Sequence, residues 1–163
     1  MRIAEIENES TVIVRVKEEQ RAADKKIIQK YLADNNLEAQ ESADGIFQVV
    51  QEEGKGPKAE NGQRATVNYT LRFIDGTLID TSYEEVAREG GAFDQRRVPY
   101  RPYTFTVGND QVIQGWHKGI PLVNKGGKST LLVPSELAYG PGGRPGVPPN
   151  TVLVFDVEVV DIK

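Results

Sequence analysis

The strongest constraint on the fold is a run in which apolar and polar residues alternate, followed directly by a turn dipeptide. From Ala65 to Ile74 the odd-numbered positions are apolar and the even-numbered ones mostly polar. A period of two residues is typical of a strand with one buried face, and the following Asp75-Gly76 is typical of a hairpin turn. A second run, Thr151 to Ile162, alternates with a mixed second face, as a central strand would. The sequence therefore predicts an antiparallel sheet.

Shorter segments complete this prediction. Tyr103 to Val107 and Lys128 to Val133 have the composition of strands. Between them, Gln111 to Lys118 is too short and too polar for a long helix, so it predicts a short one. Residues 83–101 are charged and contain Gly-Gly, which indicates an excursion between strands with one helical turn around Tyr83 to Arg88.

The N-terminal part has a different period. From about Lys17 to Asn36 apolar residues recur at helical spacing, which predicts an amphipathic helix. Its apolar side comprises Ala23, Ile27, Ile28, Tyr31 and Leu32, and its polar side includes Asp24. Residues 11–16 alternate over too short a run to separate a strand from a flexible lead. We expect residues 1–45 to form an N-terminal extension and residues 46–163 to form the main domain.

Composition excludes several classes of function. A net charge of −4 and a pI near 5.2 argue against a nucleic-acid partner. Without cysteine there is no thiolate nucleophile or thiolate metal ligand, and the single histidine, His117, which is expected to be exposed, leaves neither a hydrolytic triad nor a metal-ligand set. No run is long and apolar enough to span a membrane. The absence of a signal peptide predicts a cytoplasmic location, or the cell envelope or periplasm if the N-terminus is trimmed.

One glycine-rich segment invites a different interpretation. Lys125 to Thr130, KGGKST, is similar to the end of a phosphate-binding loop, but Leu122 stands where that motif needs its first glycine, and the segment runs into a predicted strand instead of a helix. We interpret it as a turn.

Five segments in order closely resemble the FKBP family of prolyl isomerases. They are VNYTL (67–71), DGTLIDTS (75–82), YTFTVG (103–108), QVIQGWHKGIPL (111–122) and LAYGPGGRPGVPPNTVLVFDVEVVDIK (137–163). The resemblance covers about residues 46–163. It implies an α+β fold in which a curled antiparallel sheet wraps around one short helix, preceded here by the N-terminal amphipathic helix.

The resemblance also implies an apolar pocket between that helix and the sheet. Carried over by position, the residues implied to be catalytic are Tyr69, Asp80, Trp116, Tyr139 and Phe155, with Trp116 as the floor. Those implied to bind substrate are Tyr103, Phe105, Val112, Ile113, Arg144 and Val147. The Tyr139 hydroxyl and the Ile113 backbone N–H would donate hydrogen bonds to a bound peptide. The implied ligands are proline-containing polypeptides and macrolide inhibitors, with no cofactor and no metal.

The chemistry of X-Pro rotation suits such a pocket. The barrier of about 18–20 kcal/mol arises from amide resonance, which rotation of the C–N bond removes. Since the twisted amide is less dipolar than the planar one, an apolar, dewatered pocket favours it. We therefore expect a non-covalent peptidyl-prolyl cis-trans isomerase, a rotamase that assists protein folding.

The chain departs from the family pattern at several positions. Arg144 replaces a common histidine, Ile79 replaces the usual phenylalanine beside the aspartate and removes an aromatic wall for macrolides, and Gln111 replaces a common glutamate. The segment 83–101 is longer than in minimal members. Its position beside the pocket would allow it to extend the substrate surface, but we expect Arg96, Arg97 and Arg101 to form a solvated loop face instead.

Two alternatives remain open at this level. The same pocket in a chaperone or adaptor would bind unfolded or proline-bearing segments with little isomerisation. The N-terminal helix suits docking onto its own domain better than dimerisation, because its apolar stripe is narrow and short, so we expect a monomer.

Overall fold

The centre of the fold is a pair of long antiparallel strands. The computed structural model describes residues 9–109 and 111–163. Strand β3 (Arg64–Phe73) pairs with β7 (Leu153–Ile162) from Ala65 opposite Ile162 to Phe73 opposite Leu153. The two alternating runs of the sequence therefore form the middle of the sheet, as their patterns predict.

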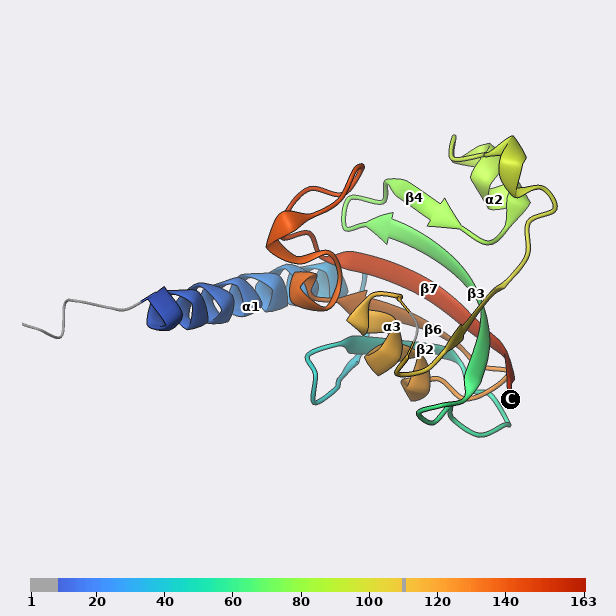
Figure 1. Cartoon of the computed structure of the whole chain (residues 1–163), viewed down its shortest axis with the longest axis horizontal. Coiled ribbons are helices and arrows are strands. Elements are labelled where there is room, and N and C mark those ends of the chain that lie inside the picture. Colours follow the sequence, from blue (N-terminus) through green and yellow to red (C-terminus); the bar gives the residue numbers. More distant parts are fainter. Residues whose placement is uncertain (1–8, 110) are drawn as a thin grey trace, which may run out of the picture.

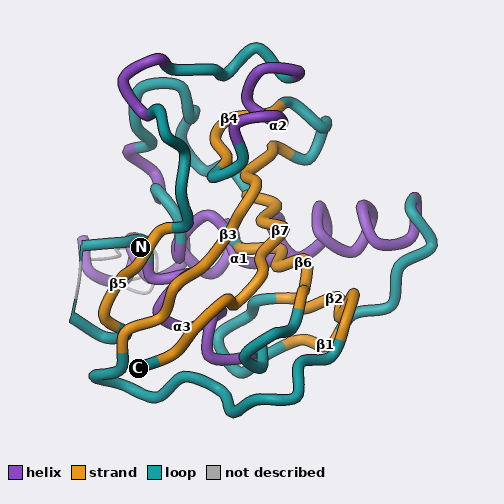
Figure 2. The backbone as a smooth tube through the Cα atoms, turned by 90° about the vertical axis from the view of Figure 1, so that its right-hand side faces the viewer, coloured by secondary structure: helices purple, strands orange, loops and turns teal. Residues whose placement is uncertain are grey.

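The other elements extend this pair into one curled antiparallel sheet, of order β1-β2-β6-β7-β3-β4, with β5 also paired to β3 (Figures 1 and 2). In chain order they are α1 (Glu9–Asp34), β1 (Gln40–Glu41), β2 (Phe47–Glu52), β4 (Leu78–Thr81), α2 (Glu84–Glu89), β5 (Tyr103–Thr106), α3 (Gln114–Gly119) and β6 (Lys128–Val133). Short 3₁₀ turns lie at Gln95–Arg97, Ile120–Leu122, Ser135–Leu137 and Gly140–Gly142. The short helices predicted around residues 83–88 and 111–118 are confirmed as α2 and α3, and KGGKST is confirmed as a turn leading into β6.

The hairpin between β3 and β4 shows why the turn dipeptide is needed. Gly76 has φ +92°, a left-handed conformation that glycine adopts without strain. The Asp75 side chain accepts a hydrogen bond from the Thr77 N–H at 2.9 Å, which closes the turn. This turn reverses the chain so that Asp80 lies opposite Leu71 on β3.

The two faces of the sheet carry separate cores. The odd-numbered residues of β3 and, from Leu153 to Val159, of β7 join Trp116 of α3 in the larger core, and the sheet curls around that helix (Figure 1). The opposite face contributes Val152 and Val154 to a smaller core that the N-terminal helix covers. The mixed second face of the last strand is thus explained, because Val154 on that face is buried under α1 while Asp156 and Val160 on the same face are exposed.

Helix α1 is longer than predicted. It begins at Glu9, and residues 11–16 belong to it, so the expectation of a strand or a flexible lead for them is wrong. Alternating valines over six residues are a weak indication of a strand, because adding residues to an existing helix is cooperative and favourable. The helix ends because Asn36 has φ +53° and the Leu37 N–H bonds to the Leu32 carbonyl, a Schellman-type termination.

The C-terminal half of α1 docks on the sheet, while its N-terminal half extends beyond the domain (Figure 1). Ile28 and Leu32 are buried in the smaller core. Tyr31 also packs against this core, so the predicted apolar side is right for these three residues, but it is wrong for Ala23 and Ile27, which are exposed. Asp24, expected on the polar side, is only 1% exposed, and its Oδ2 accepts hydrogen bonds from the N–H (2.9 Å) and hydroxyl (2.5 Å) of Ser135.

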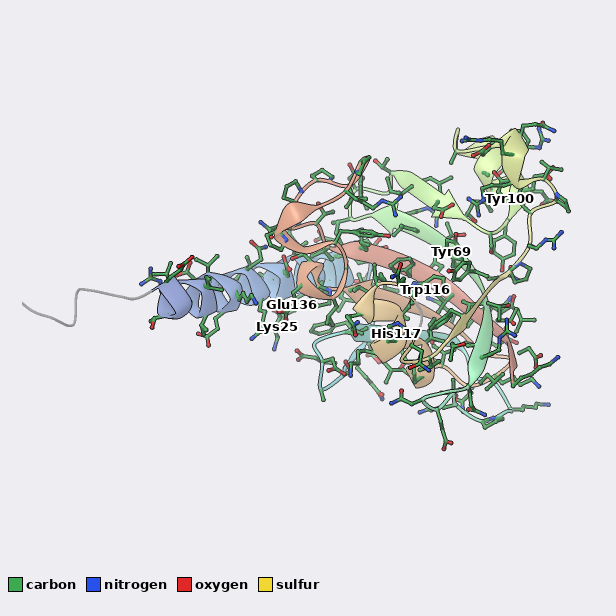
Figure 3. The ribbon with its side chains drawn as sticks, in the orientation of Figure 1. Lys25, Tyr69, Tyr100, Trp116, His117 and Glu136 are labelled. Carbon is green, nitrogen blue, oxygen red and sulfur yellow. The ribbon has the colours of Figure 1, made fainter. Side chains whose placement is uncertain are left out.

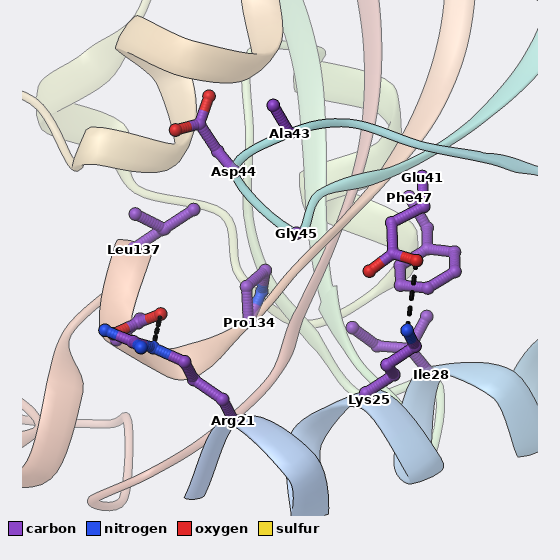
Figure 4. Close-up of a pocket in the computed structure, with 11 residues that line it drawn as sticks. Arg21, Lys25, Ile28, Glu41, Ala43, Asp44, Gly45, Phe47, Pro134 and Leu137 are labelled. Carbon is purple, nitrogen blue, oxygen red and sulfur yellow. Dashed lines mark hydrogen bonds and ion pairs between the residues drawn. The ribbon is translucent and has the colours of Figure 1, made fainter. Parts of the chain in front are cut away.

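Two ion pairs border a cleft of about 470 Å³ beside this contact, between α1 and the 134–137 turn (Figure 4). Arg21 pairs with Glu136 at 2.6 Å and Lys25 with Glu41 at 3.1 Å. Since all four side chains are partly exposed, each pair contributes little stability, and burial of Ile28 and Asp24 dominates the docking. No helix in the described part of the chain has the length and hydropathy needed to span a bilayer.

Candidate active site

A pocket of about 480 Å³ opens between α3 and the concave face of the sheet. Its lining residues are Tyr69, Leu71, Asp80, Tyr103, Gln111, Val112, Ile113, Trp116, Tyr139, Arg144 and Phe155. All but two of the site residues expected from the sequence are in this set. Phe105 lies behind Trp116, with ring centroids 5.4 Å apart, and is buried in the core. Val147 is also buried in the core, at the base of the loop that carries Arg144.

The floor of the pocket is the Trp116 indole, which is 5% exposed. Three lining rings meet it at interplanar angles of 72–76°: Tyr69 at 5.1 Å, Phe155 at 5.7 Å and Tyr103 at 5.8 Å between centroids. Tyr69 and Trp116 are seen side by side in Figure 3. Edge-to-face pairs of this kind add about 0.5–1.5 kcal/mol each beyond area burial. The floor is therefore apolar and held in one orientation.

The close approach of α3 to the sheet depends on Gly115. A Cβ at this position would lie 2.6 Å from Val133 Cγ1, closer than real Cβ contacts. At the start of the helix, Ile113 is extended, and its N–H has no acceptor among the described residues. A main-chain donor is thus available beside the indole.

One wall of the pocket is polar. The Tyr69 hydroxyl donates to Asp80 Oδ2 at 2.7 Å, and Arg97 forms an ion pair with Asp80 Oδ1. Arg97 also donates to the Thr81 carbonyl at 3.1 Å. Burial and the bond to Asp80 raise the pKa of Tyr69 well above its usual value, so its hydroxyl keeps its proton. The negative charge of Asp80 is matched inside the protein.

Arg97 corrects one expectation from the sequence. Arg96 and Arg101 are exposed, as a solvated loop face requires, but Arg97 is partly buried and turned to Asp80. Four stacked layers place it there. Arg88 lies 3.8 Å from the Phe93 centroid, Phe93 stacks on Tyr100 at 6.0 Å and 15°, and Arg97 lies 4.8 Å from the Tyr100 centroid.

This half-exposed stack holds the long segment between β4 and β5 together, beside the sheet edge where Tyr100 is labelled (Figure 3). The Tyr100 hydroxyl accepts a hydrogen bond from the Asp94 N–H at 2.8 Å, which ties the two halves of the segment together. The residues next to Arg97 in the sequence do not distinguish it from the other arginines of the segment. The only sequence signal for its role is the spacing of the aromatic and arginine residues that form the stack.

The opposite rim is formed by Tyr139 and Arg144. The Arg144 Nη1 donates to the Tyr139 hydroxyl at 3.1 Å, and its guanidinium lies 5.0 Å from the ring centroid. Since the hydroxyl accepts this bond, its own proton is free to be donated. The pocket thus offers the Tyr139 O–H and the Ile113 N–H as donors above its aromatic floor.

His117 is buried at 8% exposure, so the expectation that it is exposed is wrong. Its Nδ1 accepts the Gly108 N–H at 2.8 Å, and its ring contacts Phe105 at 5.7 Å. The helix lies so close to the sheet that both Trp116 and the next residue are covered. Among the described residues no cluster of His, Cys, Asp or Glu is placed to hold a metal ion.

Comparison with known proteins agrees with this geometry. The family model of FKBP-type peptidyl-prolyl cis-trans isomerases matches residues 56–160. FkpA of Escherichia coli K12 is 40% identical over 122 residues, which are 75% of this chain and 39% of FkpA, and Fkbp12 of Drosophila melanogaster is 39% identical over 105 residues, 64% of this chain and 84% of Fkbp12. The crystal structure of E. coli FkpA superimposes with a TM-score of 0.67 at 35% identity, covering 94% of this chain and 69% of that one.

The chain therefore belongs to the family of FKBP-type peptidyl-prolyl cis-trans isomerases. A prolyl isomerase of Pseudomonas syringae has a similar fold, with a TM-score of 0.65 at 28% identity over 87% of this chain and 95% of that one. The sheet curled around a short helix, with an N-terminal helix before it, is the fold expected from the sequence. The chain spans only 39% of the length of FkpA.

Proposed function

We propose that this protein is a peptidyl-prolyl cis-trans isomerase that accelerates rotation about X-Pro bonds of polypeptides and so assists their folding. The observation that carries the proposal is the Trp116 floor, held by three aromatic rings under a pocket where the Tyr139 O–H and the Ile113 N–H can donate to a ligand. The size of the pocket and its aromatic floor suit a prolyl ring. We assign residues 46–163 to the isomerase domain and residues 1–45 to an N-terminal extension.

The proposed mechanism needs no covalent intermediate. The prolyl ring rests on Trp116, and removal of water destabilises the dipolar planar amide relative to the twisted one. Tyr139 O–H and Ile113 N–H donate to carbonyls of the peptide, which holds the chain in a turn while the C–N bond rotates. The Tyr69–Asp80–Arg97 network contributes a fixed wall, because each polar group in it has a partner.

The test measures isomerisation of a Leu-Pro peptide by the parent and three variants whose folding is checked by circular dichroism. Trp116→Leu should lower kcat/KM more than tenfold. Tyr139→Phe should lower it about twofold to tenfold, the value of one hydrogen bond. Tyr83→Phe is the matched control, because its hydroxyl contacts Glu158 at 3.4 Å outside the pocket, and it should change nothing.

A folded parent protein that does not accelerate the reaction would refute the proposal. Binding of the peptide without acceleration would instead assign the pocket to an adaptor or chaperone. Loss of activity in Tyr83→Phe equal to that in Tyr139→Phe would refute the assignment of the donor.

Macrolide inhibitors are proposed as ligands of the same pocket, because aromatic walls that hold a prolyl ring also hold larger apolar groups. Ile79 is half-buried against the core and does not line the pocket. The aromatic wall that the family's usual phenylalanine would supply at this position is therefore missing. We expect FK506 to inhibit competitively. Inhibition that leaves KM unchanged would place the macrolide elsewhere.

We also propose that the chain is a monomer. The docking of Ile28 and Leu32 on the sheet of the same chain supports this, because it uses the apolar side of α1 internally. Light scattering at increasing protein concentration should give the mass of one chain, and a dimer mass at micromolar concentration would contradict it.

A further inference from the structure

The proposed reaction makes no use of the charge of Arg144, which lines the pocket. The guanidinium lies at the rim, bonded to the Tyr139 hydroxyl at 3.1 Å and stacked on the same ring. One donor is used, which leaves the remaining guanidinium donors for a ligand. The group therefore faces the pocket as a cation with free hydrogen-bonding capacity.

The loop that carries Arg144 is held in shape. The Arg144 N–H bonds to the Val147 carbonyl at 3.0 Å, and the Val147 N–H bonds back to the Arg144 carbonyl at 2.8 Å. Gly143 has φ +63°, and a Cβ there would lie 2.5 Å from the Val147 carbonyl oxygen. With its backbone fixed and its side chain stacked on Tyr139, the guanidinium is preorganised at the rim.

No charge within the described protein neutralises it. Asp80 and Arg144 are the two charged residues that line the pocket, and Asp80 is already paired with Arg97. In residues 9–109 and 111–163, Arg144 makes no ion pair. The lining of the pocket, with the partner of Asp80 included, therefore carries a net positive charge.

We propose that Arg144 makes this site selective for X-Pro segments that carry a carboxylate directly beside the proline, an Asp or Glu side chain. The inference rests on the proposed isomerase function and names its substrate class. Arginine binds carboxylates with two parallel hydrogen bonds and stays charged at every physiological pH. Because the contact is at the exposed rim, the selectivity should be about twofold to fivefold.

The experiment compares kcat/KM for peptides with Glu, Gln or Leu on each side of the proline. The ratio of Glu to Gln substrates measures the charge preference, since the two side chains have the same shape. The parent should give a ratio of about two to five at one of the two positions, and 0.5 M NaCl should lower it toward one by screening. Arg144→Gln should abolish the preference, and Arg144→Lys should keep part of it.

Arg101→Gln is the matched control, because it removes an exposed positive charge that does not line this pocket. It should leave the ratio at the parent value. A ratio of one at both positions in the parent, or a ratio that persists in Arg144→Gln, would overturn the inference. These outcomes leave the Leu-Pro substrate accelerated, whereas failure of the proposed function would leave it unaccelerated.

Discussion

Replacing Asp24 with alanine should loosen the attachment of α1 to the domain. The carboxylate is 1% exposed and accepts three hydrogen bonds, two from Ser135 and one from Gln20 at 2.8 Å. Each bond to a charged acceptor contributes about 1.5–3 kcal/mol, and the variant also leaves the buried Ser135 N–H without a partner. The desolvation cost that the carboxylate no longer incurs offsets part of this loss. We expect a net loss of about 3 kcal/mol in the free energy of unfolding.

Urea unfolding provides the assay, followed by Trp116 fluorescence for the domain and by circular dichroism at 222 nm for the helices. With a slope of about 2 kcal/mol/M, a loss of 3 kcal/mol lowers the midpoint by roughly 1.5 M. Asp34→Ala is the control on the same helix. Its carboxylate pairs with Lys30 on the exposed face, so the loss should be about 0.3–0.5 kcal/mol. Equal midpoints for the two variants in both signals would refute the argument that Asp24 anchors the helix.

Three further predictions concern the pocket and its supports. Tyr100→Leu should free Arg97 and lower kcat/KM roughly threefold to tenfold, and adding Arg97→Gln to it should cause little further loss. Fully additive losses in the double variant would contradict the assignment of Tyr100 as the support of Arg97. The raised pKa of Tyr69 keeps the hydroxyl protonated in the folded state, so its contribution to stability is complete below about pH 10 and is lost as the pH rises further. The free energy of unfolding of Tyr69→Phe should therefore depend less on pH than that of the parent between about pH 8 and 11. An identical pH dependence would count against a raised pKa for Tyr69. Gly115→Ala should lower the free energy of unfolding by about 1–3 kcal/mol in thermal unfolding, since its Cβ would meet a valine methyl at 2.6 Å. Gly142→Ala is the control and should be neutral, because no atom lies within 4 Å of its Cβ. A neutral Gly115→Ala would show that α3 can move away from the sheet.

The sheet could be predicted from local pattern because its central strands need no distant information. Alternation in Ala65 to Ile74 and Thr151 to Ile162 states directly which residues face the core. The pocket could not be predicted in this way, because periodicity alone does not show whether Trp116 is the floor of a pocket or an ordinary core residue. Resemblance to the family supplied that assignment, and the geometry then separated lining residues from supports such as Phe105.

The wrong expectations for Asp24, Arg97 and His117 share a physical cause, because distant partners decide whether each side chain is buried. Asp24 is buried because Ser135 lies opposite, 111 residues later in the chain. Arg97 turns inward because a carboxylate 17 residues earlier faces it across a folded loop. His117 is covered because α3 fits so closely against the sheet. A sequence pattern shows which face of an element is polar, but not which polar group will find a buried partner.

The central position of β7 has a consequence for biosynthesis. This strand lies between β3 and β6, and it supplies Phe155 to the pocket. During translation, β3 can pair with β4 and β5, and β6 with β2, but the two parts of the sheet are joined only when residues 153–162 have left the ribosome. Pairing of Ala65 with Ile162 also closes a long loop, and such contacts form slowly. The nascent chain therefore carries its aromatic residues without a pocket, and can bind proline in this way only after release of its last strand.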